Sequence, residues 1–346
     1  MKVGLLLIFQ NWHENLTDEE MYAGELRLGE MAETLGYDSV WSVEHHFDDY
    51  SMCPDNTQLL SYLAGRTSSI KLGTGAVILP WHDPVRVAEK VVLLDHLSNG
   101  RVVFGMGRGL AKMEYEGFRQ DMNESRERFD EAAAMILAAL ESGEMKGDGK
   151  FYKQPGVQIR PKPSRSFEDR VYSVAMTPDS GDAAAALGVG FMSFLQVAME
   201  QHQPAVESYR QQFRAAHGEE PPPPAFSEFL YCHPDPEEAA SVARRYLSQY
   251  FLSVVKHYEF SGTHFGKTEG YQAYDEGARM IREAGLEVAA AAYADAQPWG
   301  TPEQVVEKLQ SLRDLGLGYA ITYFLEAAYD RSGIELFETQ VIPALR

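Results

Sequence analysis

The sequence has little cysteine, few basic residues relative to acidic ones, and no long hydrophobic run. Its two cysteines, Cys53 and Cys232, form no CxxC pair, which excludes a disulfide-dense scaffold and argues against a thiolate zinc site. No apolar stretch approaches the roughly 18 residues that a membrane-spanning helix needs. The 51 acidic residues outnumber the 31 basic ones, giving a net charge of −20. Because a field of that sign repels nucleic acid and anionic membranes, we expect neither as a partner.

What remains is the composition of a globular protein. The 346 residues are 45% hydrophobic and 24% charged, and a chain of this size can bury a large core. The N-terminal apolar run, Val3–Phe9, is marginal for a signal peptide and is followed by no small-residue cleavage site. We interpret it as a β-strand and expect a cytoplasmic protein.

Apolar runs of strand length alternate eight times with segments of helical period. The candidate strands are Val3–Phe9, Ser39–Val43, Lys71–Ile78, Val102–Met106, Val171–Ala175, Phe191–Phe194, Phe226–Cys232 and Tyr319–Phe324. Most are continuously apolar, which is typical of parallel strands covered on both faces. Capping residues and prolines predict helices from Asp18 to Leu35, from Pro84 to Leu97 and from Pro302 to about Gly316. Eight strand–helix units predict an α/β fold, a (β/α)8 TIM barrel, with a doubly wound sheet as the alternative.

Two stretches interrupt this alternation. Residues 146–166 are rich in Gly, Pro and Lys and predict a surface hairpin. Residues 257–293 lie in an unusually long connection between the seventh and eighth strands. Because long insertions at the carboxyl end of a barrel are usually binding loops, we expect a lid there. We interpret 1–346 as a single domain with these two insertions.

The residues just after each strand are the candidates for chemistry, because barrel active sites lie at the carboxyl ends of the strands. After the second strand come Glu44, His45 and His46. A histidine there can act as a general acid or base, or it can be a structural residue bonded to a carboxylate. The histidines lack metal-ligand spacing such as HxxxH, so no metal site is predicted.

Small and cationic residues follow the next strands. Gly73 and Gly75 allow either close approach of a flat ligand or plain barrel packing. Arg108 lies between two glycines, a pattern that suits an anion but also a structural arginine. Ser180 begins a helix, where it can bind phosphate or simply cap. Together, Arg108 and Ser180 make a phosphate site plausible.

These residues, in this order, carry a family resemblance. The chain resembles the luciferase-like flavin monooxygenases, and within them the α subunit of bacterial luciferase (alkanal monooxygenase). The resemblance runs from end to end and rests on Trp41–Phe47 (WSVEHHF), Leu72–Arg101 (LGTGAVILPWHDPVRVAEKVVLLDHLSNGR), Phe104–Leu110 (FGMGRGL) and Asp121–Arg126 (DMNESR), with a weaker match at Gly266–Tyr274.

The resemblance implies a barrel that binds reduced FMN (FMNH2), reacts with O2 through a C4a-(hydro)peroxyflavin, and receives its flavin from a separate NAD(P)H:flavin reductase. It implies a non-proline cis peptide at Gly75–Ala76, catalysis by His45, with Glu44 and His46 beside it, and phosphate binding near Arg108 and Ser180. The implied cofactor-binding residues are Gly75, Ala76, Met106, Gly107, Arg108, Leu110, Arg126, Asp179 and Ser180. Substrate and lid positions are Ala111, Phe194, Lys267 and Tyr271.

Three positions depart from the luciferase α subunit. Gly107 replaces its reactive cysteine, Ala111 a tyrosine, and Phe194 a tryptophan. Because these positions line the flavin and aldehyde cavity in the family, the departures argue against light emission and a long-chain aldehyde substrate.

We therefore expect a two-component flavin monooxygenase that acts on a small apolar or aromatic compound. The alternatives are an alkanal monooxygenase proper, a non-catalytic flavin-binding homologue, a deazaflavin-dependent oxidoreductase, and a glycosidase using Glu44 and Glu326. The helix at 84–97 carries too many apolar residues for one buried face, and the resemblance implies a dimer through the second and third helices. A homodimer through about 55–67 and 84–97 is the predicted assembly.

Overall fold

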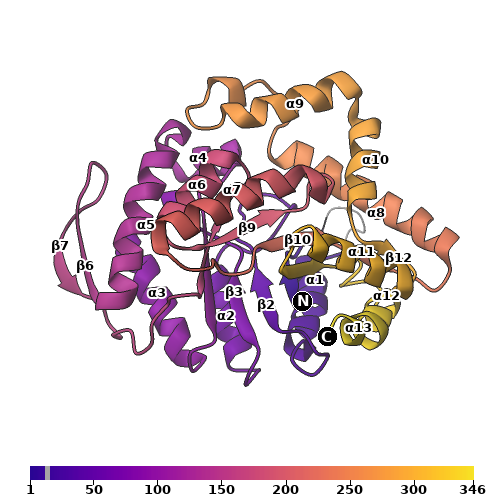
Figure 1. Ribbon diagram of the computed structural model, residues 1–346, viewed down its shortest axis with the longest axis horizontal. Coiled ribbons are helices and arrows are strands. Elements are labelled where there is room, and N and C mark those ends of the chain that lie inside the picture. Colours follow the sequence, from indigo (N-terminus) through magenta and orange to yellow (C-terminus); the bar gives the residue numbers. More distant parts are fainter. Residues whose placement is uncertain (12–15) are drawn as a thin grey trace.

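A closed barrel of eight parallel strands forms the centre of the computed structural model, which describes residues 1–11 and 16–346 (Figure 1). Its strands are β1 (Lys2–Leu7), β2 (Ser39–Ser42), β3 (Lys71–Thr74), β5 (Val102–Gly107), β8 (Val171–Val174), β9 (Gly190–Phe194), β10 (Ala225–Phe229) and β13 (Tyr319–Tyr323). They pair in the order β3-β2-β1-β13-β10-β9-β8-β5, and pairing of β3 with β5 closes the circle. The predicted TIM barrel is confirmed.

Two predicted strands are interrupted. The third divides into β3 and the short β4 (Val77–Ile78), with the cis peptide Gly75–Ala76 between them. The seventh divides into β10 and β11 (Tyr231–Cys232), and β11 pairs with β12 (Trp299–Gly300) outside the barrel.

Helices surround the barrel. They are α1 (Asp18–Met31), α2 (Asn56–Ala64), α3 (Pro84–Leu97), α4 (Lys112–Phe118), α5 (Ser125–Ser142), α6 (Pro178–Ala186), α7 (Met199–His217), α8 (Pro236–His257) and α11 (Pro302–Asp314). The chain ends in α12 (Ser332–Leu336), a π-helical turn (Phe337–Val341) and α13 (Ile342–Ala344), and 3-10 turns lie at Leu79–Trp81, Met122–Glu124 and Phe265–Lys267. Within the described ranges, no helix combines the length and apolar character needed to cross a membrane.

Local capping explains where several helices begin. Thr17 and Thr301 form reciprocal capping boxes with Glu20 and Gln304. The predicted extent of the first helix, to Leu35, was wrong. After Met31 the chain forms tight turns, because Thr34 donates both its backbone N–H and its hydroxyl to the Met31 carbonyl.

The two insertions have regular structure. Strands β6 (Glu144–Asp148) and β7 (Lys153–Gln158) form the predicted hairpin, which begins two residues earlier than expected. Between β10 and β13 the chain forms α8, then α9 (Gln272–Ala284) and α10 (Leu286–Ala296). In Figure 1, α9 crosses above the barrel and α10 descends beside α8.

Barrel packing accounts for one of the predicted small residues. A Cβ on Gly73 would lie 2.2 Å from the Trp41 ring, so this position must be glycine to admit the buried indole. Gly75 differs, because its Cβ would meet no atom closer than 3.7 Å and it lines the large cavity at the barrel end. Packing therefore explains Gly73, and only Gly75 is left to approach a ligand.

Candidate active site

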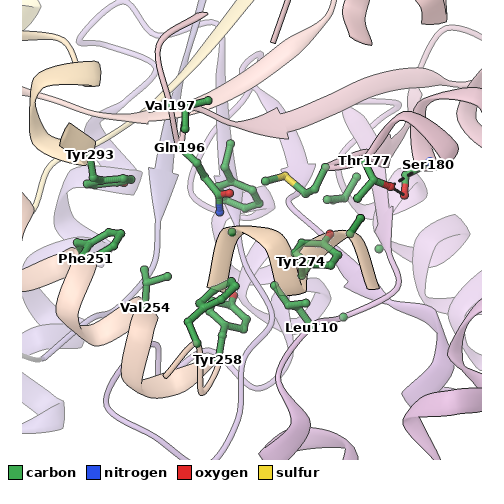
Figure 2. Close-up of a pocket in the computed structure, with 18 of the residues that line it drawn as sticks. Leu110, Thr177, Ser180, Gln196, Val197, Phe251, Val254, Tyr258, Tyr274 and Tyr293 are labelled. Carbon is green, nitrogen blue, oxygen red and sulfur yellow. Dashed lines mark hydrogen bonds between the residues drawn. The ribbon is translucent and has the colours of Figure 1, made fainter. Parts of the chain in front are cut away.

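A cavity of about 780 Å³ opens at the carboxyl ends of the strands (Figure 2). Its size is within the usual range for small-molecule and cofactor sites. Loops after β2, β3, β5, β8 and β9 form one side, and α8, α9 and α10 supply the other. The insertion between the seventh and eighth strands therefore contributes directly to the cavity.

Most of the predicted site residues line this cavity. Those that do are Glu44, His45, Gly75, Ala76, Gly107, Arg108, Leu110, Arg126, Ser180 and Phe194. Those outside the lining are His46, Met106, Ala111, Asp179, Lys267 and Tyr271. Met106 and Ala111 are fully buried, whereas Lys267 is exposed on the 3-10 turn before α9. Tyr271 is buried behind the cavity, against Arg108.

One end of the cavity is cationic. Arg126 Nη2 donates to Ser180 Oγ over 3.3 Å, and Arg108 Nη1 is buried with no hydrogen-bond partner among the described residues. Burial and the charge of Arg108 together lower the pKa of Arg126. Two guanidinium groups held this close, one of them with an unpaired buried nitrogen, fit an anion with several oxygen atoms.

The start of α6 points at the same end. Thr177 caps this helix, and its hydroxyl lies 2.9 Å from Ser180 Oγ. A helix N-terminus carries partial positive charge, which favours a bound anion. In Figure 2, Thr177 and Ser180 lie on one side of the cavity. The residue types at this end suit a phosphate.

The opposite side of the cavity is aromatic. Figure 2 places Phe251, Val254 and Tyr293 there, away from Ser180. The rings of Phe251 and Tyr293 are 5.6 Å apart, and Tyr250 lies 3.9 Å from Phe229. Apolar or aromatic ligands are the compounds that such walls bind.

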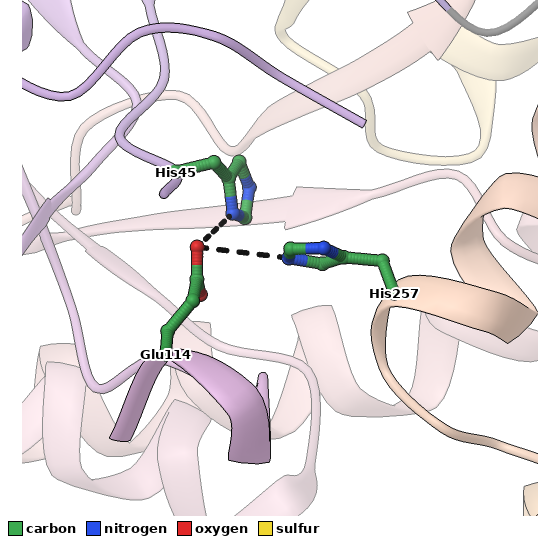
Figure 3. A group of neighbouring side chains, drawn as sticks. All are labelled: His45, Glu114 and His257. Atoms are coloured by element: carbon green, nitrogen blue, oxygen red, sulfur yellow. Dashed lines mark hydrogen bonds and ion pairs between the residues drawn. The ribbon is translucent and has the colours of Figure 1, made fainter. Parts of the chain in front are cut away.

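His45 also lines the cavity and is held by a buried carboxylate (Figure 3). Its Nδ1 is 3.1 Å from Glu114 Oε1, and its Nε2 is 3.4 Å from the Tyr258 hydroxyl. Because Nδ1 faces a carboxylate, that nitrogen carries a proton and Nε2 is the acceptor on the cavity side. The arrangement suits His45 for accepting or donating a proton.

Glu114 also faces a second histidine, His257, whose Nε2 lies 3.6 Å from Glu114 Oε1. Burial raises the pKa of the Glu114 carboxyl, but the neighbouring His45 and His257 lower it more, to about 2. Donor atoms of the three side chains lie within 4.8 Å of one another. The donor types could hold a cation, yet Glu114 Oε1 already accepts the His46 N–H at 2.7 Å.

Glu44, which lines the cavity, and His46 form a second network beside His45. Glu44 Oε1 is 3.3 Å from His46 Nε2 and 2.6 Å from His82 Nε2, and Oε2 accepts the Ile78 N–H at 3.0 Å. Burial raises the Glu44 pKa, but these hydrogen bonds lower the pKa by more, so that it lies below its usual value. The His46 ring packs against Trp81 and Phe118. Glu44 and His46 therefore support the loop after β2, which carries His45.

Sequence reasoning missed several residues of this site. Glu114, His257 and Tyr258 come from α4 and from the end of α8, in segments without a strand-end position or a motif. One signal was present in the sequence, since His257 and Tyr258 begin the segment predicted as a lid. Glu326 does not line the cavity, so Glu44 and Glu326 do not form the carboxylate pair of a glycosidase.

Comparison with known families and curated proteins gives a consistent result. Residues 1–318 match the family described as luciferase-like monooxygenase. The alkanal monooxygenase alpha chain of Photorhabdus laumondii is 25% identical, over 100% of this chain and 98% of its own length.

Solved structures have the same fold. Monooxygenase RslO1 from Streptomyces bottropensis superposes with a TM-score of 0.82 and 25% identity, over 100% of both chains. The oxygenating constituent of 3,6-diketocamphane monooxygenase from Pseudomonas putida, in complex with FMN, superposes with a TM-score of 0.78 and 17% identity. The match covers 100% of this chain and 99% of that one. An F420-dependent secondary alcohol dehydrogenase superposes with a TM-score of 0.75 and 17% identity, over 100% of this chain and 99% of that one.

Proposed function

The chain belongs to the luciferase-like monooxygenase family, and from this we propose that it is the oxygenase component of a two-component flavin monooxygenase. Its substrates would be FMNH2, O2 and a small apolar or aromatic compound, and a separate NAD(P)H:flavin reductase would supply the reduced flavin. The observation that carries the proposal is the pair Arg108 and Arg126, converging with Ser180 at one end of a cavity whose other end is aromatic.

The protein residues would hold FMN by its phosphate. Arg108 Nη1, which lacks a partner among the described residues, would donate to a phosphate oxygen, as would Arg126 and Ser180. Gly75 and Ala76 line the cavity with small side chains, which leaves room for a flat ring system. When bound, reduced flavin supplies two electrons and the carbon at which O2 reacts.

His45 would move the proton that oxygen chemistry requires. Its Nε2 faces the cavity side, and Glu114 fixes the ring through Nδ1. A histidine near neutral pH can alternate between donor and acceptor, so His45 could deliver a proton to a reacting oxygen atom and take a proton back. Glu44 and His46 would act indirectly, by supporting this wall.

The insertion would act as a lid that keeps water from the reaction. The side chains of Met280 and Val288 are 60% and 61% exposed, although both line the cavity. Inward movement of α9 and α10 would bury these apolar side chains and close the site. We also propose that residues 1–346 act as one domain and form a homodimer through α2 and α3.

A deazaflavin-dependent oxidoreductase is the second candidate, because two structural neighbours are described as F420-dependent. The phosphate site does not separate the two cofactors. FMN is favoured by the higher identity to the alkanal monooxygenase alpha chain, 25% against 17%.

Anaerobic titration with FMNH2 and with reduced F420 tests the proposal. We expect FMNH2 to bind at least about tenfold more tightly, a difference of about 1.4 kcal/mol. The loaded protein, a flavin reductase, NADH and ¹⁸O2 are then incubated with apolar aldehydes, ketones and aromatic compounds. Incorporation of one labelled oxygen atom supports a monooxygenase. Tighter binding of F420 with hydride transfer, or FMNH2 binding without any labelled product, contradicts the proposal.

A further inference from the structure

A buried row of charged side chains continues from His45 to the protein surface. His257 lies between two carboxylates, with Nε2 3.6 Å from Glu114 Oε1 and Nδ1 3.6 Å from Asp48 Oδ2. The side chains of His257 and Glu114 are 0% exposed, whereas that of Asp48 is 13% exposed. At 3.6 Å these contacts are ion pairs rather than hydrogen bonds.

The neighbours of His257 favour its charged form. Its ring stacks on Tyr50 with centroids 4.4 Å apart, and it meets His45 edge-on at 5.1 Å. Tyr258 is the other adjoining ring, at 4.9 Å. No carbonyl or hydroxyl acceptor within the described ranges hydrogen-bonds either ring nitrogen of His257. Both nitrogens therefore face only carboxylates, which an imidazolium satisfies and a neutral ring cannot.

Charge at this position acts on His45 through a shared atom. Glu114 Oε1 faces both His45 Nδ1 and His257 Nε2. If His257 were neutral, the whole carboxylate charge would favour a second proton on His45. With a cation on its other side, the same carboxylate favours that proton less.

We propose that His257 is a positioning residue that, as an imidazolium held between Asp48 and Glu114, keeps His45 available as a neutral base at the cavity. Burial lowers the pKa of His257, but Asp48 and Glu114 raise it more, so that it lies above its ordinary value. Lys256 Nζ, 3.8 Å from Asp48 Oδ1, is a second cation near this row. The inference deepens the proposed role of His45 and rests on it for its functional meaning.

The first test uses the protein without flavin, so that it does not depend on turnover. Selective ¹⁵N labelling of histidine reports by NMR which ring nitrogens carry protons, and the His45 and His257 signals are assigned by their loss in H45Q and H257Q. In wild type, we expect His257 to carry two ring protons at pH 7. In H257Q, which keeps an amide near Glu114 but no charge, His45 should hold its second proton to a pH about 1 unit higher.

Two variants guard against misfolding and non-specific effects. D48N removes the partly exposed carboxylate, so that His257 loses its charge at a lower pH. The pH at which His45 loses its second proton should then rise, but by less than in H257Q. H202Q replaces a half-buried histidine, on α7 beside Phe226, and should leave the protonation of His45 unchanged. Thermal melting confirms that each variant is folded.

The second readout is the pH dependence of single-turnover oxidation by FMNH2-loaded protein. Its alkaline shift in H257Q should match the shift of His45 measured by NMR. If the pH at which His45 loses its second proton is unchanged in both H257Q and D48N, the inference is overturned, even if the monooxygenase activity is established. A shift by NMR without any turnover supports the inference and contradicts only the proposed function. Stoichiometric Zn²⁺ or Fe²⁺ in the purified protein, lost in H257Q, would also overturn it, because His257 would then be a metal ligand.

Discussion

The guanidinium carbon of Arg108 lies 4.0 Å from the centroid of the Tyr271 ring. Tyr271 belongs to the insertion before α9, and its hydroxyl donates to the Gly109 carbonyl at 2.7 Å. The insertion is thus joined to the loop after β5 at the side chain proposed to bind phosphate. Closure of the cavity and binding of the cofactor would be linked through this pair.

Tyr271 should therefore influence cofactor affinity through its ring rather than its hydroxyl. In Y271A, loss of the cation–π contact should weaken FMN binding by about 3- to 30-fold. Y271F keeps the ring over Arg108, and its Kd for FMN should lie within about threefold of wild type, since the lost hydrogen bonds, to the Gly109 carbonyl and the Tyr115 hydroxyl, are neutral. Flavin fluorescence titration measures the Kd for FMN of both variants. Equal weakening in the two variants would contradict a role for the ring.

Arg108 should recognise the phosphate and not the flavin ring. In R108Q, loss of a charge-assisted hydrogen bond should raise the Kd for FMN by about 10- to 100-fold. Riboflavin, which lacks the phosphate, serves as the matched ligand and should bind both proteins alike. R313Q, at an exposed arginine on α11, is the control variant. If R108Q weakens FMN and riboflavin equally, the phosphate assignment is wrong.

A buried carboxyl away from the cavity should make stability depend on pH. Burial raises the pKa of Glu326 from 4.5 to about 8, and neither of its oxygens has a hydrogen-bond partner in the described ranges. Because the folded state binds this proton more tightly than the unfolded state, stability falls as pH rises from about 4.5 to about 8.

E326Q removes this dependence. Its melting temperature relative to wild type should increase from pH 5 to pH 8.5, because only the wild type must ionise a buried group. E219Q, at an exposed carboxylate, is the control, and its melting temperature should differ from that of wild type by the same amount at every pH. A pH-independent difference for E326Q would show that the carboxyl is already ionised in the folded protein.

The exposed apolar side chains of α3 should form a subunit contact. Leu93 and Leu97 are 47% and 56% exposed on an otherwise well-packed helix, and Tyr62 of α2 is 46% exposed. The double variant L93E/L97E should sediment as a monomer of about 38.7 kDa, whereas wild type should have twice that mass. V157E changes an exposed apolar residue on β7 and should not alter the mass. A monomeric wild type at micromolar concentration would contradict the dimer.

The sequence by itself determined the barrel and the cationic end of the cavity. Strands and helices follow from local hydrophobic period and from caps such as Thr301, and these signals need no tertiary information. Arg108 and Ser180 could be placed together because the carboxyl ends of parallel strands meet at one end of a barrel.

Only the tertiary structure decided which residues surround His45. Glu114 and His257 come from different helices, α4 and α8, and only the packing of both helices on the barrel brings these side chains to the His45 imidazole. Packing also separated Gly73, which admits the Trp41 ring, from Gly75, which lines the cavity. Side-chain contacts across helices depend on how distant segments pack, and a local sequence pattern carries no record of that packing.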